Sequence, residues 1–244
     1  MDIMRKTFTV GFAGVVIEID TVSTCVCVLC RDYLLEGNPD IKVKITKVDI
    51  ENELKLSPIR KKDYVSAELA AAYRKIVEAA LDYNFLLMHG AAIADGEESF
   101  VFSAPSGTGK TTHIKLWLQK SKNAMVINGD KPLIRVLDNS VVVCGTPWSG
   151  SEHMNTNIVK PLKSIVFMER GDDNFIEEIS FSQAYLRLLE QTYMPREEVK
   201  ARKMLSLLLS LNGKLSFYRF RFNNYKEDCF DVAYNTLRSG NQRF

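Results

Sequence analysis

Residues 104–111 read APSGTGKT, and these residue types at this spacing can hold a phosphate group. Gly107 and Gly109 permit backbone angles at which successive N–H groups point toward one anion. A helix expected to begin near Lys110 would add the partial positive charge of its N-terminus. Lys110 would reach the β- and γ-phosphates of a nucleoside triphosphate, and the Thr111 hydroxyl would bind Mg²⁺. The expected contact set is Ala104, Pro105, Ser106, Gly107, Thr108, Gly109, Lys110, Thr111 and Thr112.

The sequence around this loop favours a functional role over a chance match. Ala104 stands where the strict pattern has glycine, and a motif this short also arises by chance. However, an apolar strand, FVFS, is expected to lead into the loop, and a helix, KTTHIKLWLQKS, is expected to follow it. Strand, loop and helix in this order form the context in which such loops bind nucleotides. The sequence therefore predicts ATP and Mg²⁺ as ligands.

Asp130 is the candidate carboxylate for the metal or for the attacking group. It follows the apolar stretch AMVIN, which is the next expected strand after the loop helix. A right-handed strand–helix–strand crossover brings the carboxyl ends of such strands to one edge of a sheet, where ligands bind. The alternative is that Asp130 only opens a turn before Lys131 and Pro132. We expect Thr111 and Asp130 to hold the metal together.

Alternating strand and helix patterns predict an α/β protein. Residues 64–82 carry apolar side chains at helical spacing, whereas IKVKITKVDI alternates with period two and predicts a strand. We expect a small β-rich N-terminal region over residues 1–60, a linker at LSPIRKKD, and a larger domain over residues 61–244. Further strands are expected in FLLMHGAAIADGEESFVFS, PLIRVL, SVVVCG, SIVFME and KLSFYRFRF, and further helices in FSQAYLRLLEQTY, REEVKARKMLSLLLSL and YKEDCFDVAYNTLRS.

Bulk composition excludes several classes of partner. The 244 residues are 46% hydrophobic and 25% charged, and the formal net charge of +2 gives no electrostatic reason to expect nucleic acid. No apolar run reaches the length of a membrane span. The first residues have a basic flank and an apolar middle, but they lack an A-x-A-like cleavage site. We expect a cytoplasmic protein that binds neither nucleic acid nor membrane, and homo-oligomer formation stays open.

Three of the five cysteines, Cys25, Cys27 and Cys30, lie together in TCVCVLC. A structural zinc site needs four ligands, and no fourth cysteine or histidine is near in sequence. The interpretation that we favour is a β-strand in which these cysteines act as small apolar residues. Reduced thiols suit a cytosolic compartment.

The chain also resembles a known family, HPr kinase/phosphorylase and the small kinases related to it. The resemblance covers residues 85–170 and is carried by HGAAIA, SAPSGTGKTTHIKLW, INGDKPLI and GTPWSG. It implies a P-loop core like that of phosphoenolpyruvate carboxykinase, with a mixed central sheet flanked by helices.

Matched position by position, the resemblance implies roles for individual residues. Lys110 and Thr111 match the lysine and the Ser/Thr of the family's loop, and His89 matches the histidine near the transferred phosphate. Asp130 matches the second of two paired aspartates, the one taken as general base, whereas Gly129 replaces the first. Arg196 is the candidate for the family's late arginine.

The resemblance implies an ATP-dependent kinase that transfers the γ-phosphate to a hydroxyl, either a serine of a protein or peptide or a small alcohol such as free serine. The alternative is an ATPase, or a regulatory nucleotide-binding module without an acceptor, which the missing aspartate makes conceivable. Carboxykinase activity is disfavoured by the length of the chain. His153 and Trp148, near GTPWSG, either line an acceptor pocket or belong to an ordinary turn, and we expect His113 to pack or to face solvent.

Overall fold

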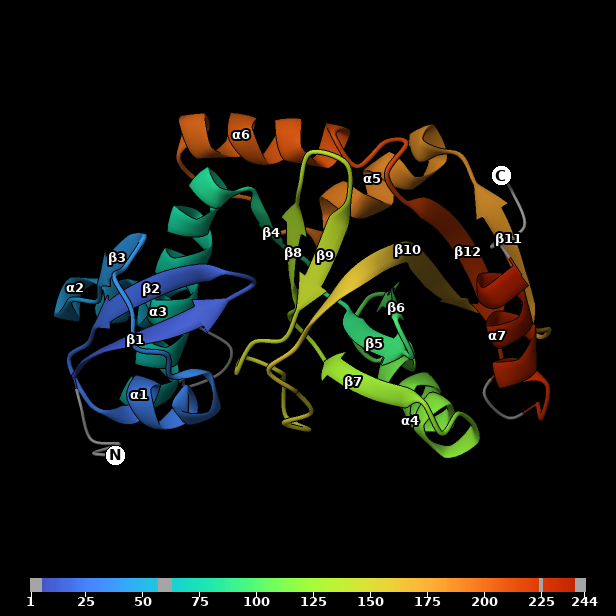
Figure 1. The fold of residues 1–244 in the computed structure, drawn as a ribbon, viewed down its shortest axis with the longest axis horizontal. Coiled ribbons are helices and arrows are strands. Elements are labelled where there is room, and N and C mark those ends of the chain that lie inside the picture. Colours follow the sequence, from blue (N-terminus) through green and yellow to red (C-terminus); the bar gives the residue numbers. More distant parts are fainter. Residues whose placement is uncertain (1–5, 57–62, 224–225, 240–244) are drawn as a thin grey trace. The chain divides into compact units, whose positions relative to one another are not determined.

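The computed structural model describes residues 6–56, 63–223 and 226–239, and the chain divides into two compact units, Met1–Phe85 and Leu86–Phe244 (Figure 1). The division falls after α3 (Tyr64–Ala80) and not near residue 60. The reason is that α3 packs against β3 (Ile41–Lys44) and α2 (Lys47–Lys55) of the first unit. The expected linker lies mainly at residues 57–62, outside the described residues.

The first unit contains a three-stranded sheet and helices. β1 (Thr7–Phe12) and β2 (Val15–Asp20) form an antiparallel hairpin, and β3 runs parallel to β2. Ala13 and Gly14 turn the hairpin with φ of 45° and 83°, the left-handed angles that tight hairpins need. The alternation predicted for β3 is confirmed, but the strand ends at Lys44. α2 follows, with Thr46 at its N-cap in a reciprocal capping box.

The cysteine-rich segment is a helix, so the predicted strand is wrong. α1 (Cys25–Leu29) has no side-chain cap of its own, and a short 3₁₀ turn (Arg31–Tyr33) follows it. Glu68 of α3 stabilises the start of α1: its Oε1 accepts hydrogen bonds from the N–H groups of Val22 and Ser23, both at 2.9 Å. This acceptor comes from a distant part of the chain, and it overrides the local preference of valine and cysteine for strands.

The second unit is built on a nine-stranded sheet, and its strands run in mixed directions, as the family resemblance implied. The strand order is β4-β8-β9-β10-β6-β5-β7, with β12 also beside β10 and β11 beside β12. β11 was not predicted. The strands are β4 (Phe85–Leu87), β5 (Ala91–Asp95), β6 (Glu98–Ser103), β7 (Ala124–Asn128), β8 (Leu133–Val136), β9 (Val141–Cys144), β10 (Val159–Arg170), β11 (Phe175–Ile179) and β12 (Ser216–Phe222).

The strand directions bring chemically important segments to one edge of this sheet. β6, β10 and β12 run parallel, whereas β5 is antiparallel to both of its neighbours, β6 and β7. β7 therefore runs in the same direction as β6. The carboxyl ends of β6, β7, β10 and β12 and the amino end of β5 share one edge, as expected of a ligand-binding sheet.

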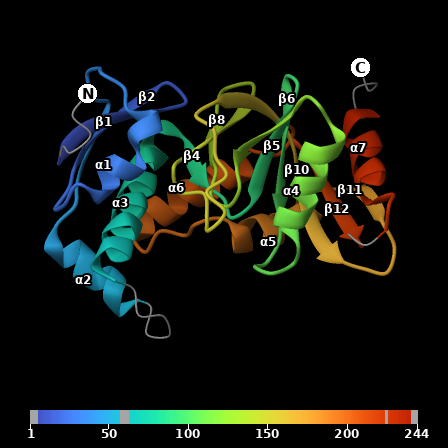
Figure 2. The same cartoon turned by 90° about the horizontal axis from the view of Figure 1, so that it is seen from below.

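Helices cover both faces of the sheet (Figures 1 and 2). On one face, Trp117 of α4 (Lys110–Lys120) packs with Phe220 of β12 and with α7 (Cys229–Ser239) in the main apolar core. On the other face, Phe217 contacts Phe181 of α5 (Phe181–Gln191), with 5.7 Å between ring centroids, and α6 (Glu198–Leu209) packs on α5. None of the helices that the structure describes is both long and apolar enough to span a bilayer.

His113 is a core residue on the inner face of α4. Its side chain is fully buried, and its Nε2 accepts a hydrogen bond of 3.0 Å from Trp117 Nε1. Its Nδ1 lies 3.7 Å from Cys229 Sγ, and the ring packs edge-on against Phe102. Burial lowers the pKa of His113 to about 3, so the folded protein holds this imidazole neutral at physiological pH.

We expect mild acid to destabilise the protein through His113. The unfolded chain protonates this residue near pH 6.5, whereas the folded chain does so only near pH 3. Its stabilising effect is therefore complete above pH 6.5 and is lost as the pH falls. The free energy of unfolding should drop by about 1.4 kcal/mol per pH unit below that point.

Denaturant unfolding at pH 7 and pH 5, followed by tryptophan fluorescence, measures this effect. In His113→Gln the side-chain carbonyl can still accept from Trp117, so the variant removes the titration while it keeps the hydrogen bond. The drop between the two pH values should be smaller in the variant by about 2 kcal/mol. An equal drop in both proteins would show that His113 is not responsible.

Candidate active site

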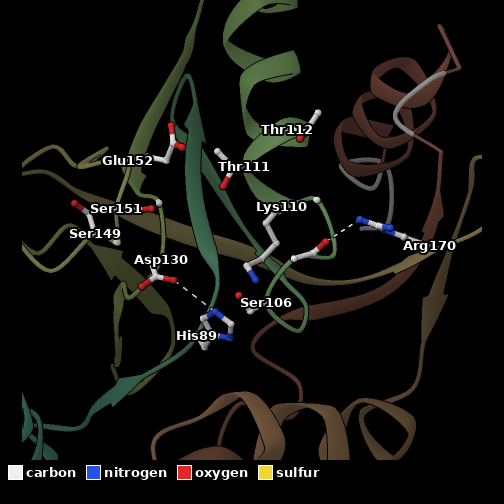
Figure 3. Close-up of a pocket in the computed structure, with 14 residues that line it drawn as sticks. His89, Ser106, Lys110, Thr111, Thr112, Asp130, Ser149, Ser151, Glu152 and Arg170 are labelled. Carbon is white, nitrogen blue, oxygen red and sulfur yellow. Dashed lines mark hydrogen bonds and ion pairs between the residues drawn. The ribbon is translucent and has the colours of Figure 1, made fainter. Parts of the chain in front are cut away.

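A cavity of about 390 Å³, here called the loop cavity, opens at the sheet edge where the carboxyl ends meet (Figure 3). Five segments line it: the loop after β6 with the first turn of α4, His89 before β5, Gly129 and Asp130 after β7, residues 149–152 after β9, and Arg170 at the end of β10. These segments are far apart in sequence. The parallel directions of β6, β7 and β10 bring them together.

The loop has the backbone that its glycines predict. Gly107 and Gly109 have φ of 79° and 122°, angles that other residues adopt only with strain. Gly109 is also the N-cap of α4, and it provides no side chain to cap the first N–H groups of that helix. Of the predicted contact residues, Ala104, Pro105 and Thr108 do not line the loop cavity, whereas Ser106, Gly107, Gly109, Lys110, Thr111 and Thr112 do.

Lys110 extends from the start of α4 into the cavity. Its side chain is only 8% exposed, and Nζ donates hydrogen bonds to the carbonyl oxygens of Ala104 at 2.6 Å and Pro105 at 3.3 Å. Burial lowers the pKa of the ammonium group, and the charge of nearby Asp130 opposes this shift. A cation held in this way has few water contacts, so an entering anion would interact with it strongly.

His89 and Asp130 form a polar pair in the cavity, with the His89 side chain near Ser106 of the loop (Figure 3). His89 Nε2 faces Asp130 Oδ1 at 3.5 Å, His89 Nδ1 lies 3.0 Å from Gln191 Oε1 of α5, and Lys131 pairs with Asp130 Oδ2. The hydrogen bond with His89 and the pairing with Lys131 hold the pKa of Asp130 well below its usual range. Asp130 is therefore an anion throughout the physiological pH range.

Buried hydrogen bonds fix the position of Asp130. Asn128, at the end of β7, is fully buried, and its Oδ1 accepts hydrogen bonds from the N–H groups of Asp130 at 2.9 Å and Lys131 at 2.7 Å. The Gly90 N–H donates to the Asp130 carbonyl oxygen at 3.0 Å, which ties the start of β5 to the end of β7. The Asp130 carboxylate thus stands on a rigid turn, as a positioned functional group requires.

The segment after GTPWSG forms a further wall. Gly150 has φ of 76°, and a Cβ added there would lie 3.0 Å from Asp130 Cβ, so glycine is what allows this close approach. Ser149, Ser151 and Glu152 line the cavity beside it. Neither Trp148 nor His153 is among the residues that line the cavity. Of the two interpretations, an acceptor pocket or an ordinary turn, this favours the turn.

Arg170 is a cavity residue that sequence analysis did not identify. Its guanidinium donates to two carbonyl oxygens of the loop, from Nη2 to Gly107 at 2.8 Å and from Nε to Thr108 at 3.1 Å. In SIVFMER it is a single basic residue after an apolar strand, and only the pairing of β10 with β6 brings it to the loop. Arg196, the residue singled out instead, is exposed between α5 and α6 and does not line the cavity.

Gly129 stands where the resemblance implies a first aspartate. A Cβ at this position would touch the Cβ and carbonyl oxygen of Met154 at 3.4 Å, so the segment after β9 closes over the glycine. The second carboxylate lining the cavity is that of Glu152, which pairs with Lys115 at 3.1 Å. Within the described ranges, no three His, Cys, Asp or Glu side chains are grouped so that they alone could hold a metal ion.

Comparisons with known proteins give a distant structural likeness and no match in sequence. No protein-family model matches the chain, and no curated protein does. Among solved structures, the chain is similar to the Hpr(Ser) kinase/phosphatase from Coxiella burnetii, with 6% sequence identity and a TM-score of 0.39, over 64% of this chain and 92% of the other. At this TM-score the two folds coincide too loosely for residue roles to be carried from one to the other.

Proposed function

We propose that the unit Leu86–Phe244 binds ATP with Mg²⁺ in the loop cavity and transfers the γ-phosphate to a hydroxyl group. One observation carries the proposal: the glycine loop, Lys110, Thr111, Asp130 and His89 line a single cavity, although they come from separate segments. The sequence motif and its resemblance to HPr kinases support the same reaction class. The residues that line the cavity support this function, whereas the fold alone would not determine it.

The loop and the start of α4 would bind the polyphosphate. Their N–H groups and the helix dipole favour an anion at this position. Lys110 would exchange the carbonyl oxygens of Ala104 and Pro105 for phosphate oxygens, and its charge would stabilise the negative charge that builds up during transfer. The loss of these two hydrogen bonds would be offset by stronger ones, because an ammonium–phosphate contact is charge-assisted.

Thr111 and Asp130 fit a magnesium site. Mg²⁺ binds oxygen ligands and in such enzymes uses few protein groups together with phosphate oxygens and water. A hydroxyl and a carboxylate that both line the cavity meet this requirement. The carboxylate oxygens of Asp130 retain further lone pairs beside their contacts with His89 and Lys131. When bound, the ion would neutralise charge on the transferring phosphate.

Asp130 would act mainly by orienting the acceptor. Because its pKa is depressed, the carboxylate is a weak base but a permanent hydrogen-bond acceptor for an incoming hydroxyl. Phosphoryl transfer passes through a loose transition state, so positioning contributes more than early proton removal. His89 would hold Asp130 in place, and residues 149–152 would form the wall beside the acceptor. A serine hydroxyl, in a protein, a peptide or the free amino acid, is the acceptor that this site would take.

ADP formation in the presence and absence of acceptors tests this proposal. The purified chain is incubated with Mg²⁺ and ATP, then with free serine, a pool of serine-containing peptides, or a bacterial lysate fraction. We expect ADP formation to rise with one class of acceptor. An equal rate without any acceptor would favour an ATPase, and no ADP under any condition would favour a regulatory nucleotide-binding module.

Arg170→Ala is expected to weaken ATP binding by about tenfold, because it removes two hydrogen bonds that hold the loop and each contributes about 0.5–1.5 kcal/mol. Arg170→Lys should restore little of this affinity, since an ammonium cannot reproduce the planar pair of donors. Calorimetric titration measures the effect. Arg187→Ala is the control, because Arg187 pairs with Glu169, the residue before Arg170, outside the cavity. Equal losses in Arg170→Ala and Arg187→Ala would contradict the prediction.

A further inference from the structure

A second hollow, of about 300 Å³, adjoins the loop cavity on the other side of the loop. Gly109, Thr112 and Arg170 line both spaces, so the two are neighbours at the start of α4. The rest of the second hollow is formed by Thr108 and by the ends of β10 and β12, which contribute Gly171, Phe222 and Asn223. Neither His89 nor Asp130 lines it.

The order of the strands in the sheet defines two sides of the loop. From the loop at the end of β6, Asp130 lies on one side, across β5 at the end of β7, whereas β10 and β12 lie on the other side. The reacting end of a polyphosphate must face Asp130 and His89, because these groups would receive the acceptor. The chain of phosphates then crosses the loop and the first turn of α4. Its other end leaves toward β10 and β12.

We propose that the second hollow holds the nucleoside of the nucleotide whose phosphates occupy the loop. The inference rests on the proposed function and adds the orientation of the ligand and the residues at its base end. It follows from the shared lining at Gly109, Thr112 and Arg170, which places the second hollow directly beside the space that the phosphates would occupy.

The chemistry of the second hollow suits a flat, polar ring system. The exposed guanidinium of Arg170 is held in one orientation by the carbonyl oxygens of Gly107 and Thr108. A planar cation fixed in this way can stack on a purine. Asn223 is anchored through its backbone, because its N–H donates to Asn174 Oδ1 at 2.6 Å, so its side chain can be changed without loss of that anchor.

The test uses ADP and pyrophosphate, which share two phosphates but differ by the nucleoside. Calorimetric titration with Mg²⁺ compares the wild-type chain, Asn223→Trp and Asn223→Ala. Asn223→Trp fills the hollow and should weaken ADP binding by about tenfold or more, whereas pyrophosphate binding should stay within about twofold. Asn223→Ala leaves the hollow open and should reduce ADP affinity less than Asn223→Trp does.

Pyrophosphate binding by each variant also shows that the fold and the loop are intact. Unchanged ADP affinity in Asn223→Trp, or equal weakening of ADP and pyrophosphate, would overturn the nucleoside site while leaving the phosphate site standing. A wild-type chain that binds neither ligand would instead overturn the proposed function, and the nucleoside site with it.

Discussion

Replacing Asp130 with asparagine is expected to lower the rate of phosphoryl transfer by about a hundredfold or more and to leave ATP affinity within about threefold. The amide has nearly the same size, so the close approach of Gly150 is preserved. The neutral amide cannot accept, from an incoming hydroxyl, the charge-assisted hydrogen bond that the carboxylate accepts. The amide oxygen of asparagine can still serve as an oxygen ligand of Mg²⁺, and the loss of a negative charge lessens repulsion of the polyphosphate, so ATP affinity should change little. The change should therefore appear in turnover.

Initial rates and calorimetric titration of the same preparations measure the two quantities. Lys131→Met is the matched control: Lys131 pairs with Asp130 but does not line the cavity, so turnover should fall by less than about fivefold. Parallel losses of binding and turnover in Asp130→Asn would show that this carboxylate holds the nucleotide and does not orient the acceptor.

Replacing Lys110 with alanine is expected to reduce both binding and turnover. The ammonium acts on the phosphates before transfer and on the charge that develops during it, so we expect affinity to fall at least tenfold and turnover by about a hundredfold or more. The fold should survive, because burying this ammonium carries a desolvation cost that its two hydrogen bonds to carbonyl oxygens only partly offset.

Lys120→Met provides the control for Lys110→Ala. Lys120 lies in the last turn of the same helix, where it pairs with Asp231 at 3.6 Å, and it does not line the loop cavity. The variant removes one positive charge from α4 and should keep affinity and turnover. If Lys110→Ala bound ATP as tightly as Lys120→Met, Lys110 would not be a phosphate ligand.

The sequence predicted the elements whose signals are local. The helical spacing over residues 64–82 and the alternation at residues 41–45 correspond to α3 and β3. The glycines of the loop have the predicted backbone angles, because steric freedom at a glycine depends on nothing distant. The strand and helix that flank the loop also lie where periodicity predicted them.

Features that depend on distant residues could not be predicted. α1 follows a turn in which Glu68 accepts hydrogen bonds from the N–H groups of Val22 and Ser23, and no property of TCVCVLC indicates this partner. α2 did carry a signal, the Thr46–Asp49 capping pair, but the alternation before it extended the predicted strand too far. The spacing over residues 64–82 predicts a helix whichever unit that helix packs on, so it does not predict a division after α3.

In the candidate site, too, the features that depend on distant residues could not be predicted. His89, Lys110 and Asp130 were identified by motif and by resemblance, and they line one cavity. Sequence alone does not predict that Arg170, and not Arg196, reaches the loop, because the register of β10 against β6 decides this. The insertion of β5 between β6 and β7, which brings His89 beside Asp130, is likewise a property of topology.

The destination of the γ-phosphate is the most direct test of the proposed reaction. The chain is incubated with Mg²⁺, ATP labelled in the γ-phosphate and the three classes of acceptor, with Asp130→Asn in parallel. We predict label in a phosphate ester on a serine-bearing acceptor, and about a hundredfold less with the variant. Label that stays on ATP or appears only as free phosphate, with every acceptor and equally in both proteins, would contradict transfer to a hydroxyl.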